Sequence, residues 1–125
     1  MHIQISNASE KPIYEQITAQ IKSSILTGEL RPGDALPSLR LLAKELRISV
    51  ISTKRAYEEL EREGFIESVA GKGSFVAQQN PELLREEHLR IVESYLQQAV
   101  DTARASGVSL TELRDMLGLL YGDEY

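Results

Sequence analysis

The chain has 125 residues, no cysteine, two histidines and a formal net charge of −5. This length allows one small domain with an appendage, and the absence of cysteine excludes disulfides and thiolate chemistry. No apolar run approaches the roughly 20 residues of a membrane span, and the first residues lack the pattern of a signal peptide. We therefore expect a cytoplasmic protein that makes no membrane contact.

The acidity of the chain is confined to its second part. Residues 1–79 hold ten Lys or Arg and ten Asp or Glu, so their charges cancel. Residues 80–125 hold four Lys or Arg and nine Asp or Glu, so the net charge of −5 arises there. Within residues 40–55 only one acid, Glu45, accompanies five cations: Arg40, Lys44, Arg47, Lys54 and Arg55. Such a basic cluster is the electrostatic footprint of a nucleic-acid contact, although charge runs also occur on ordinary solvated helix faces.

The first 37 residues are interpreted as scaffold. Residues 1–6 are compatible with a short strand or with a loose arm. A helix is predicted from Pro12 to Gly28, because proline suits a first turn and apolar residues recur along one face: Ile13, Tyr14, Ile17, Ile21 and Ile25. This helix is expected to support its neighbours without contacting a ligand. Ala35 and Leu36 are expected to form a short strand beside a later hairpin.

Residues 38–60 predict two helices joined by a tight turn. Ser38 and Ser49 each precede an apolar helical repeat, where a serine side chain accepts a hydrogen bond from an unpaired amide. The first repeat consists of Leu39, Leu42, Ala43 and Leu46, and the second of Thr53, Ala56, Tyr57 and Leu60. Both repeats have the spacing of an amphipathic helix.

The outward side of the second helix carries groups that suit DNA. Ile51 and Arg55 point directly away from the predicted core, and Ser52 and Lys54 lie on the two shoulders. A hydroxyl, two cations and a branched apolar side chain suit phosphates, base edges and a thymine methyl group. Most amphipathic helical pairs bind no nucleic acid, so this interpretation depends on the segment that follows.

Residues 64–77 predict a β-hairpin directly after these helices. Gly64 ends the second helix, and two β-prone runs flank the turn Ala-Gly-Lys-Gly, with Lys72 at its tip. A helix-turn-helix followed by such a hairpin is a winged helix. Gly71–Ser74 also resembles a fragment of a phosphate-binding loop, but the complete spacing is absent, so we expect no bound nucleotide.

Residues 12–77 resemble the DNA-binding domain of the GntR family of bacterial transcription regulators. The matching stretches, in order, are PIYEQI (12–17), GELRPGDALPSLRLLA (28–43), IS (48–49), RAYEELEREGFI (55–66) and GKGSFV (71–76). The resemblance implies a winged helix that binds operator DNA as a dimer. The family's DNA-contacting residues fall on Arg40, Lys54 and Gly71. Val50 replaces the arginine that the family usually has after the capping residue, so the operator sequence does not carry over.

Combining the two lines of reasoning gives one expected DNA-contacting set. Its members are Ser38, Arg40, Ser49, Val50, Ile51, Ser52, Lys54, Arg55, Gly71, Lys72 and Gly73.

The remaining residues predict two helices that need a partner. Asn80 and Pro81 begin a helix that runs through Ala105, and a capping box at Ser109 begins a second one. Two helices cannot bury so broad an apolar stripe alone, so we expect a twofold dimer. The expected interface consists of Leu84, His88, Leu89, Ile91, Val92, Tyr95, Leu96, Ala99, Leu113, Leu117 and Leu120. This short tail resembles the YtrA-like branch of the family.

We therefore expect a mainly α protein with a winged helix-turn-helix domain (1–79, three helices and a small β-hairpin) and a two-helix dimerisation region (80–125). The expected function is transcriptional regulation, as a repressor, through an inverted repeat in double-stranded DNA bound by a homodimer. We expect no enzyme activity, catalytic residue, cofactor or metal, and the sequence names no small-molecule effector. A second interpretation is a winged-helix adaptor for protein interactions, with the acidic tail as its docking surface; specific retention of an inverted repeat in a gel-shift assay separates the two.

Overall fold

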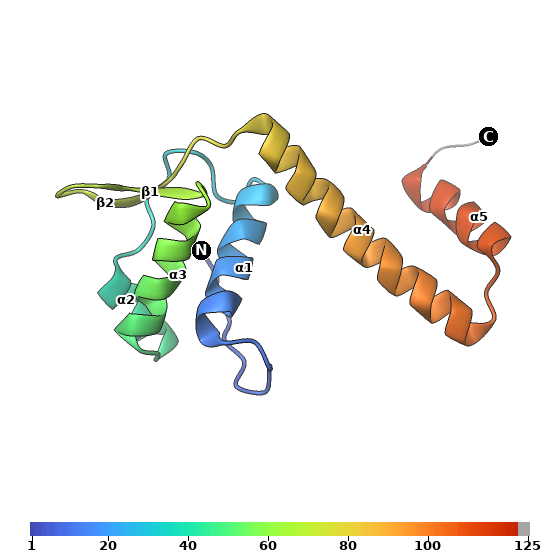
Figure 1. Ribbon diagram of the computed structural model, residues 1–125, viewed down its shortest axis with the longest axis horizontal. Coiled ribbons are helices and arrows are strands. Elements are labelled where there is room, and N and C mark those ends of the chain that lie inside the picture. The colour runs from blue at the N-terminus through green and yellow to red at the C-terminus, as the bar shows by residue number, and fades with distance from the viewer. Residues whose placement is uncertain (123–125) are drawn as a thin grey trace. The chain divides into compact units, whose positions relative to one another are not determined.

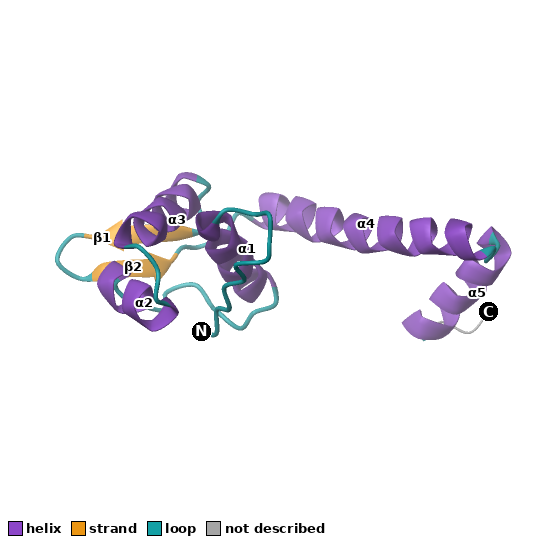
Figure 2. Ribbon diagram, turned by 90° about the horizontal axis from the view of Figure 1, so that it is seen from below, coloured by secondary structure: helices purple, strands orange, loops and turns teal. Residues whose placement is uncertain are grey.

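The computed structural model describes residues 1–122, which form five α-helices and one two-stranded antiparallel sheet (Figures 1 and 2). The elements in chain order are α1 (Ile13–Leu26), α2 (Leu39–Leu46), α3 (Val50–Arg62), β1 (Ile66–Val69), β2 (Gly73–Val76), α4 (Pro81–Ser106) and α5 (Leu110–Tyr121). The prediction of a mainly α fold with a winged helix-turn-helix followed by helices is confirmed.

The chain divides into two compact units within α4. The first unit ends at Leu84 and the second begins at Arg85. The predicted division after residue 79 lies in the preceding loop, because the change in composition occurs there. In the structure the first turn of α4 belongs to the winged unit.

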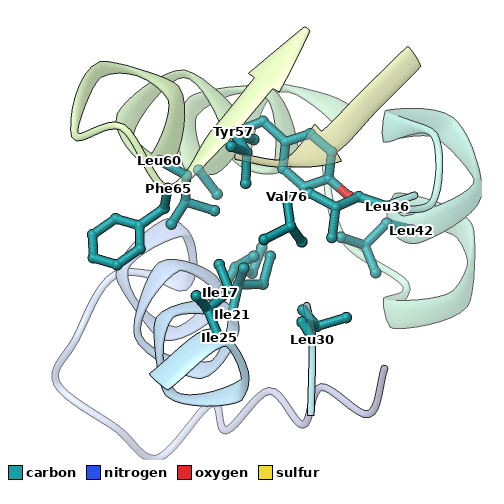
Figure 3. Packing of buried hydrophobic residues seen from close by; sticks show 12 residues of the cluster. Ile17, Ile21, Ile25, Leu30, Leu36, Leu42, Tyr57, Leu60, Phe65 and Val76 are labelled. Atoms are coloured by element: carbon teal, nitrogen blue, oxygen red, sulfur yellow. The ribbon is translucent and has the colours of Figure 1, made fainter. Parts of the chain in front are cut away.

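One hydrophobic core holds the first unit together, and α1, α2, α3 and the hairpin all contribute to it (Figure 3). Its members are Ile17, Ile21, Ile25, Leu30, Leu36, Leu42, Ala56, Tyr57, Leu60, Phe65, Ile66 and Val76. The apolar repeats predicted for the first three helices therefore face one another. Leu39 and Leu46, at the two ends of α2, are half-buried against this core.

The N-terminal arm is fastened to α1 by two glutamine side chains. The Gln20 amide pairs with both backbone groups of Gln4, accepting from its N–H at 2.9 Å and donating to its carbonyl at 2.7 Å. The Gln16 side chain pairs in the same way with Ser6, at 2.9 and 3.0 Å. The arm therefore forms no strand, since side chains satisfy the backbone groups that a neighbouring strand would have paired.

The hairpin is a three-part structure rather than an isolated pair of strands. β1 and β2 pair antiparallel, with Ile66 opposite Val76 and Val69 opposite Gly73. An antiparallel β-bridge joins Ala35 to Phe75 of β2, which agrees with the prediction that Ala35 and Leu36 lie beside the hairpin. The Leu36 N–H donates to the Ser74 carbonyl at 2.9 Å. The wing is thereby tied to the segment that leads into α2.

The turn between α2 and α3 contains a strained residue. Arg47 has a φ of 57°, in the left-handed region, where a non-glycine residue costs roughly 1–2 kcal/mol. The next residue, Ile48, offsets this cost: its N–H donates to the Ala43 carbonyl at 3.0 Å, and its side chain packs against the core. Apolar periodicity does not indicate this conformation.

The second unit contains most of α4 and all of α5. Ala103 is buried, and the Val108 N–H donates to the Ala103 carbonyl at 2.9 Å to close the end of α4. The Ser109 side chain accepts from the Glu112 N–H at 3.1 Å, which confirms the predicted cap of α5. The two helices thus form a hairpin.

Replacing Tyr57 with phenylalanine is expected to lower the free energy of unfolding by about 1–2 kcal/mol. Its hydroxyl donates to the Pro37 carbonyl at 2.8 Å, and the variant leaves that carbonyl without its donor. Burial raises the pKa of Tyr57 above its ordinary value. Only the unfolded phenol therefore ionises just above about pH 10, and stability falls as the pH rises from there.

Urea unfolding of both chains at about pH 7 and about pH 11 tests this pair of effects. The native chain should lose more stability between the two pH values than Tyr57→Phe does. Equal losses would show that the Tyr57 phenol does not contribute to the pH dependence.

Candidate nucleic-acid interface

Helix α3 has one face in the core and the other in solvent. Thr53 and Ala56 are completely buried, and the Thr53 hydroxyl donates to the Ser49 carbonyl at 3.1 Å. On the opposite side Ile51 is 80% exposed and the Lys54 side chain is 66% exposed. Val50 is also exposed, whereas Ser52 is half-buried. The first two turns of α3 therefore offer an apolar and a cationic side chain to solvent.

The two serines expected to contact DNA are helix caps. The Ser38 hydroxyl oxygen accepts from the Leu41 N–H at 3.1 Å, and that of Ser49 accepts from the Ile51 N–H at 2.9 Å. Both serines are exposed. Each hydroxyl hydrogen remains available to donate to a phosphate while the oxygen caps its helix.

A groove of about 430 Å³ lies between the start of α2 and the wing. It is lined by Leu36, Pro37, Ser38, Leu39, Arg40, Tyr57, Lys72, Gly73 and Ser74. Arg40 and Lys72, which are distant in sequence, thus meet at one concavity. Within residues 1–122 neither cation takes part in an ion pair. Their charges therefore attract an anion to this groove.

The tip of the wing is shaped by glycines. Gly71 and Gly73 have φ angles of 75° and 106°, which a residue with a side chain rarely adopts. The intervening Lys72 is exposed, and its N–H donates to the Val69 carbonyl at 2.9 Å. The backbone at the tip carries no side chain on either side of Lys72, so it is able to approach a phosphate closely.

A second depression lies on α3 itself. It is lined by Ile51, Lys54, Arg55, Glu58 and Glu59. Lys54 forms an ion pair with Glu58 at 3.8 Å, and both side chains are about two-thirds exposed. Such a solvated pair contributes at most about 1 kcal/mol, so Lys54 exchanges this partner easily for a phosphate or a base edge.

Arg55 does not extend freely into solvent. Its guanidinium lies over the ring of Tyr14 in α1, with the Cζ atom 3.9 Å from the ring centre. Sequence reasoning placed Tyr14 on the buried stripe of α1, and the residue is in fact half-buried. Periodicity within one helix does not report which exposed residues of two helices meet, so this contact was missed.

The second unit exposes its predicted apolar stripe. Of the residues expected at the dimer interface, Leu84 and Leu113 are half-buried, and the others are exposed in the single chain. Leu120, at 85% exposed, and Leu119, at 81%, lie almost entirely in solvent on α5.

Among residues 1–122 no group of three His, Cys, Asp or Glu is placed to hold a metal ion. No helix in this part of the chain is long and apolar enough to cross a membrane.

The comparisons with known proteins agree with this geometry. Residues 13–76 match the family described as bacterial regulatory proteins, gntR family. The HTH-type transcriptional repressor YtrA of Bacillus subtilis is 37% identical, over 97% of this chain and 93% of its own length. The crystal structure of a transcriptional regulator from Oenococcus oeni matches with a TM-score of 0.74 at 26% identity, over 94% of this chain and 97% of that one.

A structure with DNA also matches the winged unit. The AraR DNA-binding domain in complex with operator ORX1 has a TM-score of 0.53 at 29% identity, and the match covers 62% of this chain and all of that one. The family match runs from α1 to the end of β2, and the YtrA match extends over nearly the whole chain. The chain therefore belongs to the GntR family of bacterial regulatory proteins, as a DNA-binding transcriptional regulator of the short, YtrA-like type.

Proposed function

We propose that the chain is a transcriptional repressor that binds an inverted-repeat operator as a homodimer. The observation that carries this proposal is the exposed first half of α3, beside a groove in which Arg40 and Lys72 meet. Tyr57 of α3 lines the same groove, so the groove is continuous with the helix that we take as the recognition helix. An exposed helix beside two cations without acid partners supports the proposal, because a duplex presents a groove that accepts a helix and flanking phosphates.

The binding mode follows from the size of the DNA grooves. The major groove of B-DNA is about 12 Å wide and accepts one α-helix. We place the start of α3 in it, with Lys54 at a base edge and Ile51 against a thymine methyl group. Arg40 and the capping serines then contact phosphates, and Lys72 contacts the backbone or the adjacent groove.

Dimer formation is supported by the exposed apolar side chains of α4 and α5. A single winged unit makes few phosphate contacts, and linking two such units raises affinity by about 10²–10⁴. A twofold dimer presents two identical reading surfaces, which matches an inverted repeat. We propose that the predicted stripe on α4 and α5 forms this interface.

Repression is favoured because the relative YtrA, which matches nearly full length, is named a repressor. The adaptor interpretation is not favoured, since the relatives and the matching structures are transcription regulators. A regulator of this kind acts on the bacterial chromosome, so we place it in the cytoplasm.

Removing a cation from the reading surface is expected to weaken binding. Arg40→Ala or Lys54→Ala should cost roughly 1–3 kcal/mol of binding free energy, and a residue at a base edge should also relax preference at one position. Gel-shift titration against a duplex selected from random DNA measures both effects. Arg104→Ala is the matched control, because it removes an exposed cation from α4 in the second unit and should leave affinity unchanged. Native affinity in both test variants would refute the assigned surface.

Reversing the charge at the wing tip is expected to lower affinity and to flatten its salt dependence. Lys72→Glu removes one phosphate contact, so fewer counterions are released on binding. The fold should persist, because Lys72 is exposed. Lys72→Arg, which retains the charge, should retain the slope of log affinity against log salt. A native slope in Lys72→Glu would place the wing away from DNA.

Placing a charge in the apolar stripe of α4 is expected to give a monomer. Leu96 is 47% exposed in the single chain, and Leu96→Glu would bury a carboxylate in the dimer. Sedimentation should detect the dissociation, and affinity for the inverted repeat should fall by about 100-fold or more. Ser94→Glu adds the same charge at an exposed position outside the stripe and should remain dimeric. A monomeric native chain would refute the proposed assembly.

A further inference from the structure

Tyr14 and Arg55 form a stacked pair between α1 and α3. The Arg55 Cζ atom lies 3.9 Å from the centre of the Tyr14 ring, which places the guanidinium against the ring face. The Tyr14 hydroxyl donates to the Glu15 carboxylate at 3.3 Å. A free arginine side chain samples many rotamers, whereas this stack restricts Arg55 to a narrow range.

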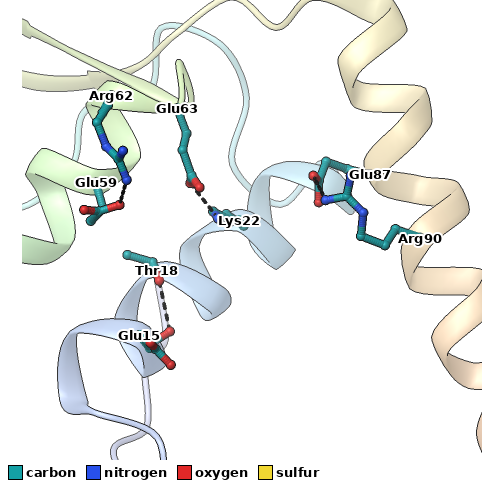
Figure 4. A network of polar contacts seen from close by, with 8 residues as sticks. All are labelled: Glu15, Thr18, Lys22, Glu59, Arg62, Glu63, Glu87 and Arg90. Carbon is teal, nitrogen blue, oxygen red and sulfur yellow. Dashed lines mark hydrogen bonds and ion pairs between the residues drawn. The ribbon is translucent and has the colours of Figure 1, made fainter.

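The two acids that share a depression with Arg55 are paired with other cations. Arg55 shares its depression with Glu58 and Glu59. Glu58 pairs with Lys54. Glu59 pairs with Arg62, as Figure 4 shows. None of the ion pairs within residues 1–122 includes Arg55. A stacked guanidinium uses one face on the ring and keeps its N–H edge available to an acceptor.

A second side-chain contact, an ion pair, joins α1 to the end of α3 and serves as a comparison for the stack of Arg55 on Tyr14. Lys22 pairs with Glu63 at 2.6 Å (Figure 4). The two contacts are eight residues apart along both segments, from 14 to 22 in α1 and from 55 in α3 to its C-cap at 63, so α1 and α3 run side by side in the same direction. Of these two contacts, only the stack involves a residue, Arg55, that lines the depression containing Ile51 and Lys54.

We propose that Tyr14 is a positioning residue for DNA binding, which holds Arg55 so that its N–H edge meets a backbone phosphate beside the groove that α3 enters. This inference rests on the proposed function. Arginine recognises phosphate through a planar fork of donors, and a side chain that is already ordered loses less rotamer entropy on binding. Helix α1, whose apolar pattern indicates only a scaffold, thereby takes part in recognition.

The test uses the full-length chain and the duplex that the native chain enriches from random-sequence DNA. Arg55→Ala should lower affinity and reduce the slope of log affinity against log salt by about one. Tyr14→Leu should lower affinity about two- to fivefold and leave the slope unchanged, because the phosphate contact persists without its support. Arg55→Lys should resemble Tyr14→Leu, and Tyr14→Phe should retain native affinity, since it keeps the ring.

The double variant Tyr14→Leu with Arg55→Ala separates positioning from structure. It should bind no more weakly than Arg55→Ala alone, because Tyr14 then has no guanidinium to hold. Lys22→Met removes the ion pair between α1 and Glu63 and should lower the stability of the fold without changing its affinity for DNA. Additive losses in the double variant, or native affinity in Tyr14→Leu, would overturn the inference and leave the proposed function intact. A native chain that enriches no duplex would overturn both.

Discussion

The orientation of α3 depends on the burial of one of its faces, and the surface that we propose for DNA binding depends on that orientation. Thr53, Ala56 and Leu60 are completely buried, so the helix cannot rotate without exposing apolar surface, at about 25 cal/mol per Å². Tyr57 adds a directional constraint, because its hydroxyl bonds the Pro37 carbonyl just before α2. The same residue therefore orients α3 and the entry into α2, while the opposite face of α3 remains in solvent.

Local charge, rather than net charge, explains how an acidic chain presents a surface for DNA. The formal charge of −5 arises beyond residue 79, and interactions between exposed charges are screened within about 10 Å at moderate salt. Arg40 and Lys72 face one groove and have no acid partner in the described part of the chain, so an anion in this groove meets two uncompensated cations. The excess of acids thus lies in a different part of the sequence from the two cations of this groove.

The two units differ in how much of their apolar surface is buried within the single chain. The winged unit closes a core around side chains such as Ile17 and Ile21, which are completely buried. The second unit buries little, and α5 exposes Leu119 and Leu120 almost entirely. Large apolar side chains exposed to this extent favour an interaction with another surface. The exposed side chains of the second unit are those that we propose to pack against a second copy of the chain.

The sequence by itself determined the order of the elements, the caps at Ser38, Ser49 and Ser109 and the buried face of α3, because capping and periodicity are local properties of the chain. Only the tertiary structure decided that Arg40 and Lys72 share a groove and that Arg55 stacks on Tyr14. These contacts join residues from different elements. A helical repeat predicts which face of a helix is polar, but it does not predict which residues of another element contact that face. The left-handed conformation of Arg47 was likewise visible only in the tertiary structure, where the core contact and the backbone hydrogen bond of Ile48 accompany it.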